Sequence, residues 1–501
     1  MFLMVFSIML TVGCGKKPST VKNNSSKSTS ITTASEQSGD MSSSAESSEI
    51  SSNTNSILSS TSNSANGNSS QGKPNVNLPT TNMWGNKPGE KSTKKMPDFA
   101  TKLKNNTITF LTASCPEVNE QAIKLQDFKA LTGCDLKFNY KIVPWGSLTS
   151  QLATMVLSGS SPDMFMMGQE TAMFINNKPY FEDIQKYINM NDALFEGVKQ
   201  YSTSMFYKSK QYAVASGAPS CYRGFMYNKS LMSAAGLEDP VSLFKNGKWD
   251  LDKFYEYVTE LTVDQNKDGT PEVWGVSMSN ETWMNAALST GKDLITVNSD
   301  GTIKNNLNDP NFTRIYSYAE KIGRISYDPT SWQWEGRFKA NQIAMIAGNP
   351  WMSMSTSSMT EMKKAGKIGW VPFPKDPKAS KYYSAADILY EFIPKGAKNP
   401  EAIAAWYYFC RYSAVNPNPA TEKKMNQNAK DKWGWTDEDI NFVGKEMVKY
   451  LTPVLWISNN IPDFTKKDVL CVQGYKVAWS TVVQEVNPSL QAAIDKINSG
   501  R

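Results

Sequence analysis

Residues 108–167 read ITFLTASCPEVNEQAIKLQDFKALTGCDLKFNYKIVPWGSLTSQLATMVLSGSSPDMFMM. Three short segments are strand candidates: the apolar runs 108–113 and 164–167, and 136–143 between them. Between them, apolar residues recur at helical spacing, and the two helical patterns end at Gly133 and Gly159. Alternating strands and helices are typical of an α/β fold with a mostly parallel sheet. Because ligands bind at the carboxyl ends of such strands, residues 112–117 and 167–171 are candidate site loops.

The rest of the chain repeats this pattern less regularly, and we find no internal sequence repeat. Residues 274–279 and 343–346 favour further strands. Asp250 is placed to cap a helix, Asn399-Pro400 to begin another that runs to about Tyr412, and Asn487-Pro488 to begin the last.

Composition excludes several classes of protein. The chain has 501 residues, of which 40% are hydrophobic and 20% charged, which excludes a polytopic membrane protein. The net charge is +6, and residues 1–95 hold nine Lys and five acidic residues. The remainder is therefore nearly neutral and lacks the strongly basic surface that nucleic-acid binding requires. Histidine is absent, which excludes Ser-His-Asp and Cys-His catalysis and histidine-bound zinc.

The N-terminus has the pattern of a targeting segment. Residues 1–12 are almost continuously apolar and are followed by Gly13-Cys14. The run is too short to span a bilayer but suits a signal peptide, here residues 1–13. It resembles a bacterial lipoprotein signal, which implies that Cys14 carries acyl chains at the outer face of a cell membrane. The alternative is an ordinary secretory signal with an incidental cysteine.

Residues 14–95 form a compositionally distinct segment. Ser, Thr and Asn make up 42 of the 78 residues from 18 to 95. Such a segment cannot bury enough apolar surface to offset its chain entropy, so we expect a disordered tether of roughly 50 Å. A tether of this kind suits a Gram-positive surface. The five later cysteines contain no CxxC pair and predict neither a disulfide framework nor a metal cluster; they are Cys115, Cys134, Cys221, Cys410 and Cys471.

Five ordered segments resemble the extracellular solute-binding proteins of ABC importers, in the branch that includes maltodextrin-binding proteins. The most specific is 338–351, FKANQIAMIAGNPW. The other four are 152–163 (LATMVLSGSSPD), 212–229 (YAVASGAPSCYRGFMYNK), 236–261 with its Trp-Asp before a helix, and 393–409 with its Asn-Pro and Ala-rich helix.

This resemblance implies two α/β lobes of the type II binding-protein fold, interleaved in sequence, with a solute held between them and no catalysis. The expected crossovers lie near 218–225, 372–384 and 454–462. Expected partners are a carbohydrate solute and the transmembrane subunits of an ABC permease, with the protein itself a monomer. The predicted divisions are 96–217 and 381–453 for the first lobe, 218–380 for the second, and 454–501 for a crossover and C-terminal helices of the second.

The candidate solute-binding residues are mostly aromatic. Trp351 follows the apolar strand 343–346 and matches an aromatic that stacks on a sugar in the relatives; the alternative is a packed core tryptophan. Glu170 stands where the family has a carboxylate that accepts hydrogen bonds from sugar hydroxyls. Aromatic walls with a few polar groups suit a neutral polar ring. Further candidates are Trp145, Tyr222, Arg223, Trp283, Trp332, Trp334, Glu335 and Asp387.

One loop matches the start of an EF-hand calcium site. Oxygen-bearing side chains occupy its positions 1, 3, 5 and 9, glycine occupies position 6, and Gly275 replaces the usual glutamate at position 12. Calcium here would be structural, and the alternative is an Asn/Asp/Gly-rich turn. The candidate ligands are Asp264, Asn266, Asp268, Thr270 and Glu272.

Two other functions are compatible with the composition. One is a surface glycosidase that uses paired carboxylates, which would release reducing sugar from oligosaccharides. The other is a tethered binding or sensor protein that uses the same fold without transport, which neighbouring genes for two permease subunits would argue against.

Overall fold

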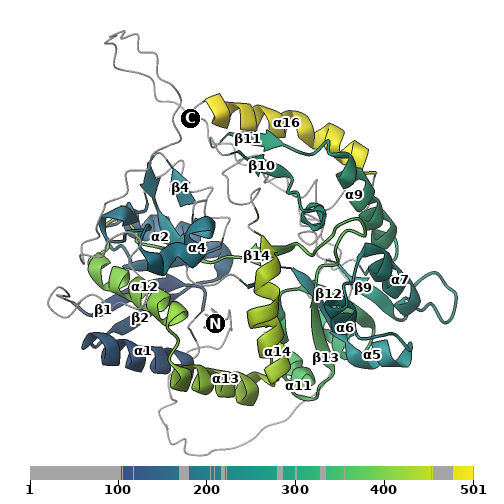
Figure 1. Cartoon of the computed structure of the whole chain (residues 1–501), viewed down its shortest axis with the longest axis horizontal. Helices are drawn as coiled ribbons and strands as arrows, with labels where there is room; N and C mark the ends of the chain where they lie inside the picture. The colour runs from purple at the N-terminus through teal and green to yellow at the C-terminus, as the bar shows by residue number, and fades with distance from the viewer. Residues whose placement is uncertain are drawn as a thin grey trace, which may run out of the picture. The chain divides into compact units, whose positions relative to one another are not determined.

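The structure is a computed structural model that describes residues 103, 105–114, 116, 118–168, 180–202, 205–207, 209–215, 220–221, 223–278, 286–298, 302–327, 334–354, 356–452, 454 and 478–499. Two sheets with separate hydrophobic cores organise these residues (Figure 1). We call the body around the five-stranded sheet the first lobe and the body around the four-stranded sheet the second lobe. The signal peptide, Cys14 and the tether lie outside the described residues.

The first lobe is built on a sheet with the strand order β2-β1-β3-β15-β6. β1 pairs in parallel with β2 and β3, while β15 is antiparallel to β3 and β6. The parallel pairing of β1, β2 and β3 confirms the α/β pattern expected from residues 108–167. The strands are β1 (Thr107–Thr112), β2 (Lys137–Ile142), β3 (Met164–Met167), β6 (Ala213–Ala215) and β15 (Tyr390–Phe392).

Helices α1 and α12 pack against one another through aromatic rings. The ring of Phe128 in α1 lies 6.0 Å from that of Trp406 and 5.3 Å from that of Phe409 in α12, centroid to centroid. The helical elements are α1 (Val118–Thr132), η1 (Trp145–Ser147), α2 (Leu148–Leu157), η3 (Ile184–Lys186), η4 (Ala193–Phe195), α4 (Glu196–Ser202) and α12 (Pro400–Val415); a small hairpin joins β4 (Phe206–Tyr207) and β5 (Lys210–Gln211).

A buried carboxylate holds the amino-terminal ends of β1 and β3 to the start of α12. Asp163, only 4% exposed, accepts hydrogen bonds from the backbone N–H groups of Thr109, Lys398 and Asn399 at 2.8–2.9 Å. The side chain of Asn399 adds a contact to Asp163 at 3.3 Å and one to the Thr107 carbonyl at 2.8 Å. Asp163 is thus a scaffold residue that joins segments far apart in sequence.

The second lobe is built on a sheet with the order β13-β8-β12-β9. β12 runs parallel to β9 and antiparallel to β8. Its strands are β8 (Gly224–Asn228), β9 (Trp274–Ser277), β12 (Ile343–Gly348) and β13 (Ile368–Pro372), with a separate hairpin of β10 (Ile295–Val297) and β11 (Ile303–Asn305). The helical elements are α5 (Lys229–Ala234), α6 (Pro240–Lys245), α7 (Leu251–Leu261), η6 (Ala287–Thr290), α9 (Pro310–Gly323), α10 (Trp334–Lys339), η7 (Pro350–Met354) and α11 (Ser357–Lys364).

A three-stranded crossover sheet, in the order β16-β14-β7, connects the two lobes. Its strands are β7 (Ser220–Cys221), β14 (Ser384–Asp387) and β16 (Leu451–Thr452). Along β14 the chain changes core, because Ala385 belongs to the second core and Ala386 to the first. The expected fold of two interleaved lobes with crossover strands is therefore confirmed.

The segment after α12 reaches both lobes. In α13 (Pro419–Trp433), Thr421 donates a hydrogen bond to Asp127 of α1 at 2.8 Å, whereas Trp433 lies in the second core. The elements that follow are α14 (Asp437–Asn441), η8 (Phe442–Glu446) and η9 (Met447–Tyr450). Their buried residues Phe442, Val443 and Met447 also belong to the second core, although the sequence assigned 381–453 to the first lobe.

The last helix begins earlier than the sequence predicted. α16 (Trp479–Ser499) contains Pro488 in its interior, so Asn487-Pro488 does not start it. Trp479 stacks on Tyr316 of α9 with centroids 3.8 Å apart, and Val482 and Val486 continue the buried face. Tertiary packing of that face outweighs the cost of an internal proline.

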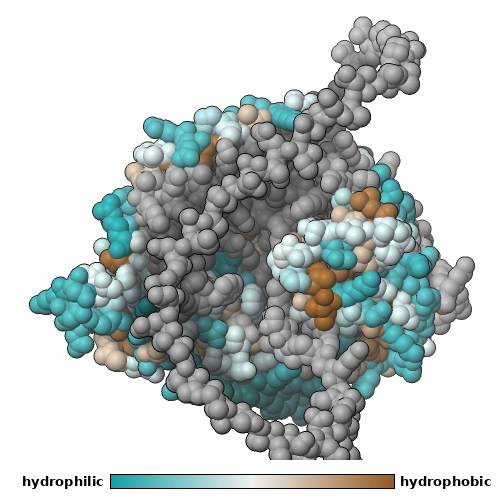
Figure 2. All heavy atoms as spheres, turned by 180° about the vertical axis from the view of Figure 1, so that it is seen from behind, coloured by the Kyte–Doolittle hydropathy of each residue, from teal (hydrophilic) through white to brown (hydrophobic). Residues whose placement is uncertain are grey.

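The described surface is mostly hydrophilic on the face that Figure 2 shows, with small hydrophobic patches. None of the helices in the described ranges combines the length and the hydrophobicity that a membrane span requires.

Candidate functional site

Three chain segments meet at the carboxyl end of β12. Gly348, the last residue of β12, pairs with Gly224 at the start of β8, and Gly224 also pairs with Pro372 at the end of β13. The first crossover precedes Gly224 and the second follows Pro372. The turn that carries Trp351 therefore begins where the chain passes between lobes.

Trp351 lies in η7 and is partly buried against the second core. The turn before it is held tightly: the indole N–H of Trp370 donates to the Gly348 carbonyl at 3.1 Å. A Cβ at position 348 would lie 1.9 Å from the sulfur of Met352, so a larger residue here would force the Met352 side chain to move. An indole that is only half-buried on a rigid turn is suited to cover an apolar face of a ligand.

Trp334 and Glu335 open α10 on the same lobe. Trp334 is also partly buried against the second core. The carboxylate of Glu335 accepts hydrogen bonds from the hydroxyls of Thr356 and Ser358. Thr356 is the N-cap of α11, which begins shortly after the Trp351 turn. The Glu335 carboxylate is therefore engaged at the start of α11.

One described candidate from the first lobe lies near the carboxyl end of a strand. Trp145 follows the carboxyl end of β2 and is partly buried against the first core. The Val143 N–H donates to the Thr112 carbonyl at 3.1 Å, which keeps this turn beside the end of β1.

Two more candidates lie at the crossovers. Asp387 ends β14 and pairs with Ser220 of β7, and Arg223 is half-buried directly before β8. The remaining candidates Glu170, Tyr222, Trp283 and Trp332 lie outside the described residues.

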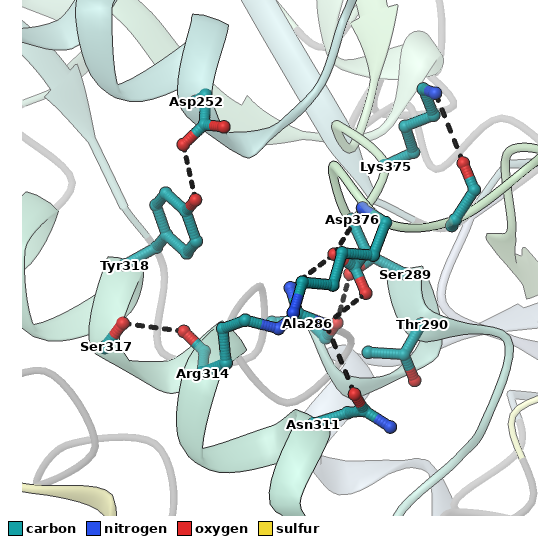
Figure 3. Close-up of polar contacts among 12 residues, drawn as sticks. Asp252, Ala286, Ser289, Thr290, Asn311, Arg314, Ser317, Tyr318, Lys375 and Asp376 are labelled. Atoms are coloured by element: carbon teal, nitrogen blue, oxygen red, sulfur yellow. Dashed lines mark hydrogen bonds and ion pairs between the residues drawn. The ribbon is translucent and has the colours of Figure 1, made fainter.

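The second crossover is anchored to the second lobe by an ion pair that the sequence did not indicate. Figure 3 shows Arg314 of α9 pointing at Asp376, which is 3% exposed and lies just past β13. The contact is bidentate, with 2.6 Å between Nη2 of Arg314 and Oδ2 of Asp376. Burial favours the neutral acid, but the hydrogen bonds from Arg314 and the Lys378 N–H lower the pKa of Asp376 below its usual value.

Further contacts fix the same segment. The backbone N–H of Asp376 donates to the Ser289 carbonyl, and Tyr318 of α9 donates to Asp252 of α7 (Figure 3). Arg314 and Asp376 are 62 residues apart and neither belongs to a local motif. No signal in the sequence pairs them, because only the packing of α9 against the crossover brings them together.

The predicted calcium loop is a chain of turns closed by its own side chains. Oδ2 of Asp264 accepts from the Gly269 N–H at 2.9 Å, and Glu272 accepts from the Gln265 N–H at 2.6 Å. The other carboxylate oxygen of Asp264 is buried and has no hydrogen-bond partner, which leaves it able to bind a cation. Within the described ranges, however, no three His, Cys, Asp or Glu side chains are grouped closely enough to hold a metal. The loop fits calcium only in part.

Comparisons with known proteins agree on the fold. A family profile described as "Bacterial extracellular solute-binding protein" matches residues 117–409. No curated protein sequence matches the chain significantly.

Solved structures resemble the chain over most of its length. The ABC substrate-binding protein Lmo0181 from Listeria monocytogenes, in complex with cycloalternan, is 19% identical with a TM-score of 0.56, covering 79% of this chain and 98% of its own. The GacH receptor of Streptomyces glaucescens, solved with acarbose, is 16% identical with a TM-score of 0.54, covering 78% and 98%. An extracellular solute-binding protein from Staphylococcus aureus with maltose is 14% identical with a TM-score of 0.53, covering 79% and 100%.

At these identities the structures establish a shared fold, and the profile match spans more than half of the chain. The two interleaved lobes and the crossover sheet are the architecture that this match predicts. The chain belongs to the family of bacterial extracellular solute-binding proteins.

Proposed function

We propose that the protein captures a sugar or oligosaccharide outside the cell and delivers it to the permease of an ABC importer. The observation that carries this proposal is the Trp351 turn, a half-buried indole on a rigid turn at the crossover end of the second sheet. Flat aromatic faces with a few polar groups around them match the alternating apolar and hydroxyl surfaces of a sugar ring. The sugar complexes of the similar structures support the same solute class.

The proposed location follows from the N-terminus. Acyl chains on Cys14 hold the protein at the outer face of the membrane, and residues 14–95 act as a tether between the anchor and the lobes. A protein that starts at residue 96 should then fold and bind the same solute with unchanged affinity. Loss of folding or binding in that shortened protein would show that the segment belongs to the domain.

A thermal-shift screen tests the solute class. The purified protein is melted with monosaccharides, linear and cyclic oligosaccharides and, as controls, amino acids. A ligand that binds only the folded state raises its stability by RT ln(1 + [L]/Kd), which is about 2.7 kcal/mol at 100 times Kd. At least one saccharide should raise the melting temperature by several degrees while amino acids do not. A shift with amino acids alone would contradict the proposal.

A further inference from the structure

We propose that Glu335 is a positioning residue, which holds the Trp351 turn in place through the start of α11 and does not contact the solute. The inference rests on the proposed function and deepens it, since it assigns a residue that determines how well Trp351 is presented. It also separates two neighbouring candidates, Trp334 and Glu335, into different roles.

The first step is the contact itself. The Glu335 carboxylate and the hydroxyls of Thr356 and Ser358 are 2.5 Å apart in both cases, and all three side chains are part-buried. Hydrogen bonds from hydroxyls to a carboxylate are short and about twice as strong as neutral ones. The negative charge also lies near the N-terminus of α11, where the helix dipole favours it.

The second step is the place of the contact along the chain. η7, which contains Trp351, ends at Met354, and Thr356 caps α11 by accepting from the Met359 N–H at 3.3 Å. Glu335 therefore binds the chain two residues beyond the turn. The amino-terminal side of the turn is fixed by Gly348 and Trp370, so Glu335 supplies the second point of attachment.

The third step is what the arrangement leaves for a solute. Oε1 of Glu335 already accepts two hydrogen bonds, from the hydroxyls of Thr356 and Ser358. The carboxylate links α10, which carries Trp334, to the segment that follows Trp351. The indoles of Trp334 and Trp351 both pack partly on the second core. The hydrogen bonds of Glu335 therefore fix the positions of these two side chains relative to each other.

The first experiment needs no solute. Amide hydrogen exchange of the ligand-free protein is followed in peptides that cover residues 350–360, where the Met352, Met359 and Thr360 N–H groups are hydrogen-bonded. Glu335→Ala should speed exchange there by roughly tenfold or more, while exchange in the first lobe stays unchanged. Glu335→Gln, which keeps an acceptor oxygen, should restore most of the protection. Glu361→Ala, an exposed carboxylate on α11, is the matched control. Unchanged exchange in Glu335→Ala would overturn the proposal.

The second experiment uses the saccharide found in the thermal-shift screen. Glu335→Ala should weaken binding roughly 5- to 50-fold, and Glu335→Gln by no more than about threefold. In a Trp351→Ala background, Glu335→Ala should add less than about twofold, because its effect passes through that indole. A full additional loss in that background would mean direct contact with the solute and would overturn the positioning role. If the unaltered protein binds no saccharide, the proposed function fails, while the exchange experiment still decides the role of Glu335.

Discussion

The two large sheets differ in whether their interior strands contain charged residues. The central part of the first sheet contains a carboxyl group, Glu391 in β15, which is 6% exposed, whereas none of the four strands of the second sheet contains Asp, Glu, Lys or Arg. In the second lobe the buried carboxylates Asp293 and Asp376 lie outside these strands, and Asp376, beyond the end of β13, is paired with Arg314. The first sheet therefore contains a buried carboxyl group, whereas the second sheet is free of charged residues and has the Trp351 turn at the end of β12.

The surroundings of Glu391 explain how the first lobe tolerates it. Burial raises the pKa of Glu391 to about 8, because the charged form loses its hydration. The charge of Lys124 in α1 acts to lower that pKa, but Lys124 is itself bound to Glu120 at 2.8 Å. Burial would lower the pKa of Lys124, yet the charge and hydrogen bond of Glu120 leave it above the usual value. Lys124 and Glu120 thus form an ion pair, while the carboxyl group of Glu391 stays protonated at neutral pH.

The largest effect is expected where the first lobe relies on a buried carboxylate. Asp163→Ala leaves three backbone N–H groups without their acceptor, at about 1–3 kcal/mol for each. We expect a loss of roughly 3–5 kcal/mol in the free energy of unfolding, measured by denaturant titration. Asp135→Ala, at an exposed carboxylate, is the control. A loss below about 1 kcal/mol in Asp163→Ala would contradict the scaffold role.

The next effect concerns pH. The pKa of Glu391 is about 8 in the folded chain and lies near 4.5 when unfolded, so the folded state keeps a proton that the unfolded state releases between these values. The contribution of Glu391 to the free energy of unfolding is fully present below about pH 4.5. It is lost as pH rises toward 8, by at most about 1.4 kcal/mol per pH unit.

Glu391→Gln removes that proton exchange. Its stability relative to the unaltered chain should therefore rise between pH 5 and pH 8, as measured by melts at each pH. The exposed Glu260→Gln, on α7 of the second lobe, should show no such trend. A stability difference between Glu391→Gln and the unaltered chain that does not change with pH would show that Glu391 is not a buried protonated acid.

A smaller effect is expected at the loop of the second lobe. We propose that Asp264, Asn266, Asp268, Thr270 and Glu272 hold a structural calcium ion through their oxygen atoms, with the unpaired Asp264 oxygen as the first ligand. EDTA should lower the melting temperature by a few degrees and calcium should restore it, whereas Asp264→Asn should show neither response. An unchanged melting temperature in EDTA and in calcium would show that the loop is a turn without a metal.

Local pattern predicted much of the fold. The apolar runs and glycine stops of residues 108–167 correspond to β1, α1, β2, α2 and β3, because each depends on neighbours within a few residues. The sequence predicted Asp163 only as part of a turn, because its hydrogen-bond partners at 398 and 399 lie about 235 residues away. The same limit hid the Arg314–Asp376 pair and the partners of Glu335. The prediction that a helix starts at Pro488 was wrong, because packing against α9 stabilises α16 on both sides of this proline.

The central claim is that Trp351 binds the solute and does not merely fill space. It is tested by calorimetric titration of Trp351→Ala with the saccharide found by screening, beside ligand-free melts. Trp274→Ala is the matched control, because Trp274 is also partly buried on the second core but starts β9, at the opposite end of the sheet from the Trp351 turn.

We expect Trp351→Ala to weaken binding by about 2–4 kcal/mol, or roughly 30- to 1000-fold in Kd, with little change in the ligand-free melting temperature. Trp274→Ala should leave Kd unchanged. Near-normal affinity in Trp351→Ala, together with a ligand-free stability loss of about 3–5 kcal/mol, would make Trp351 a packing residue and contradict the account.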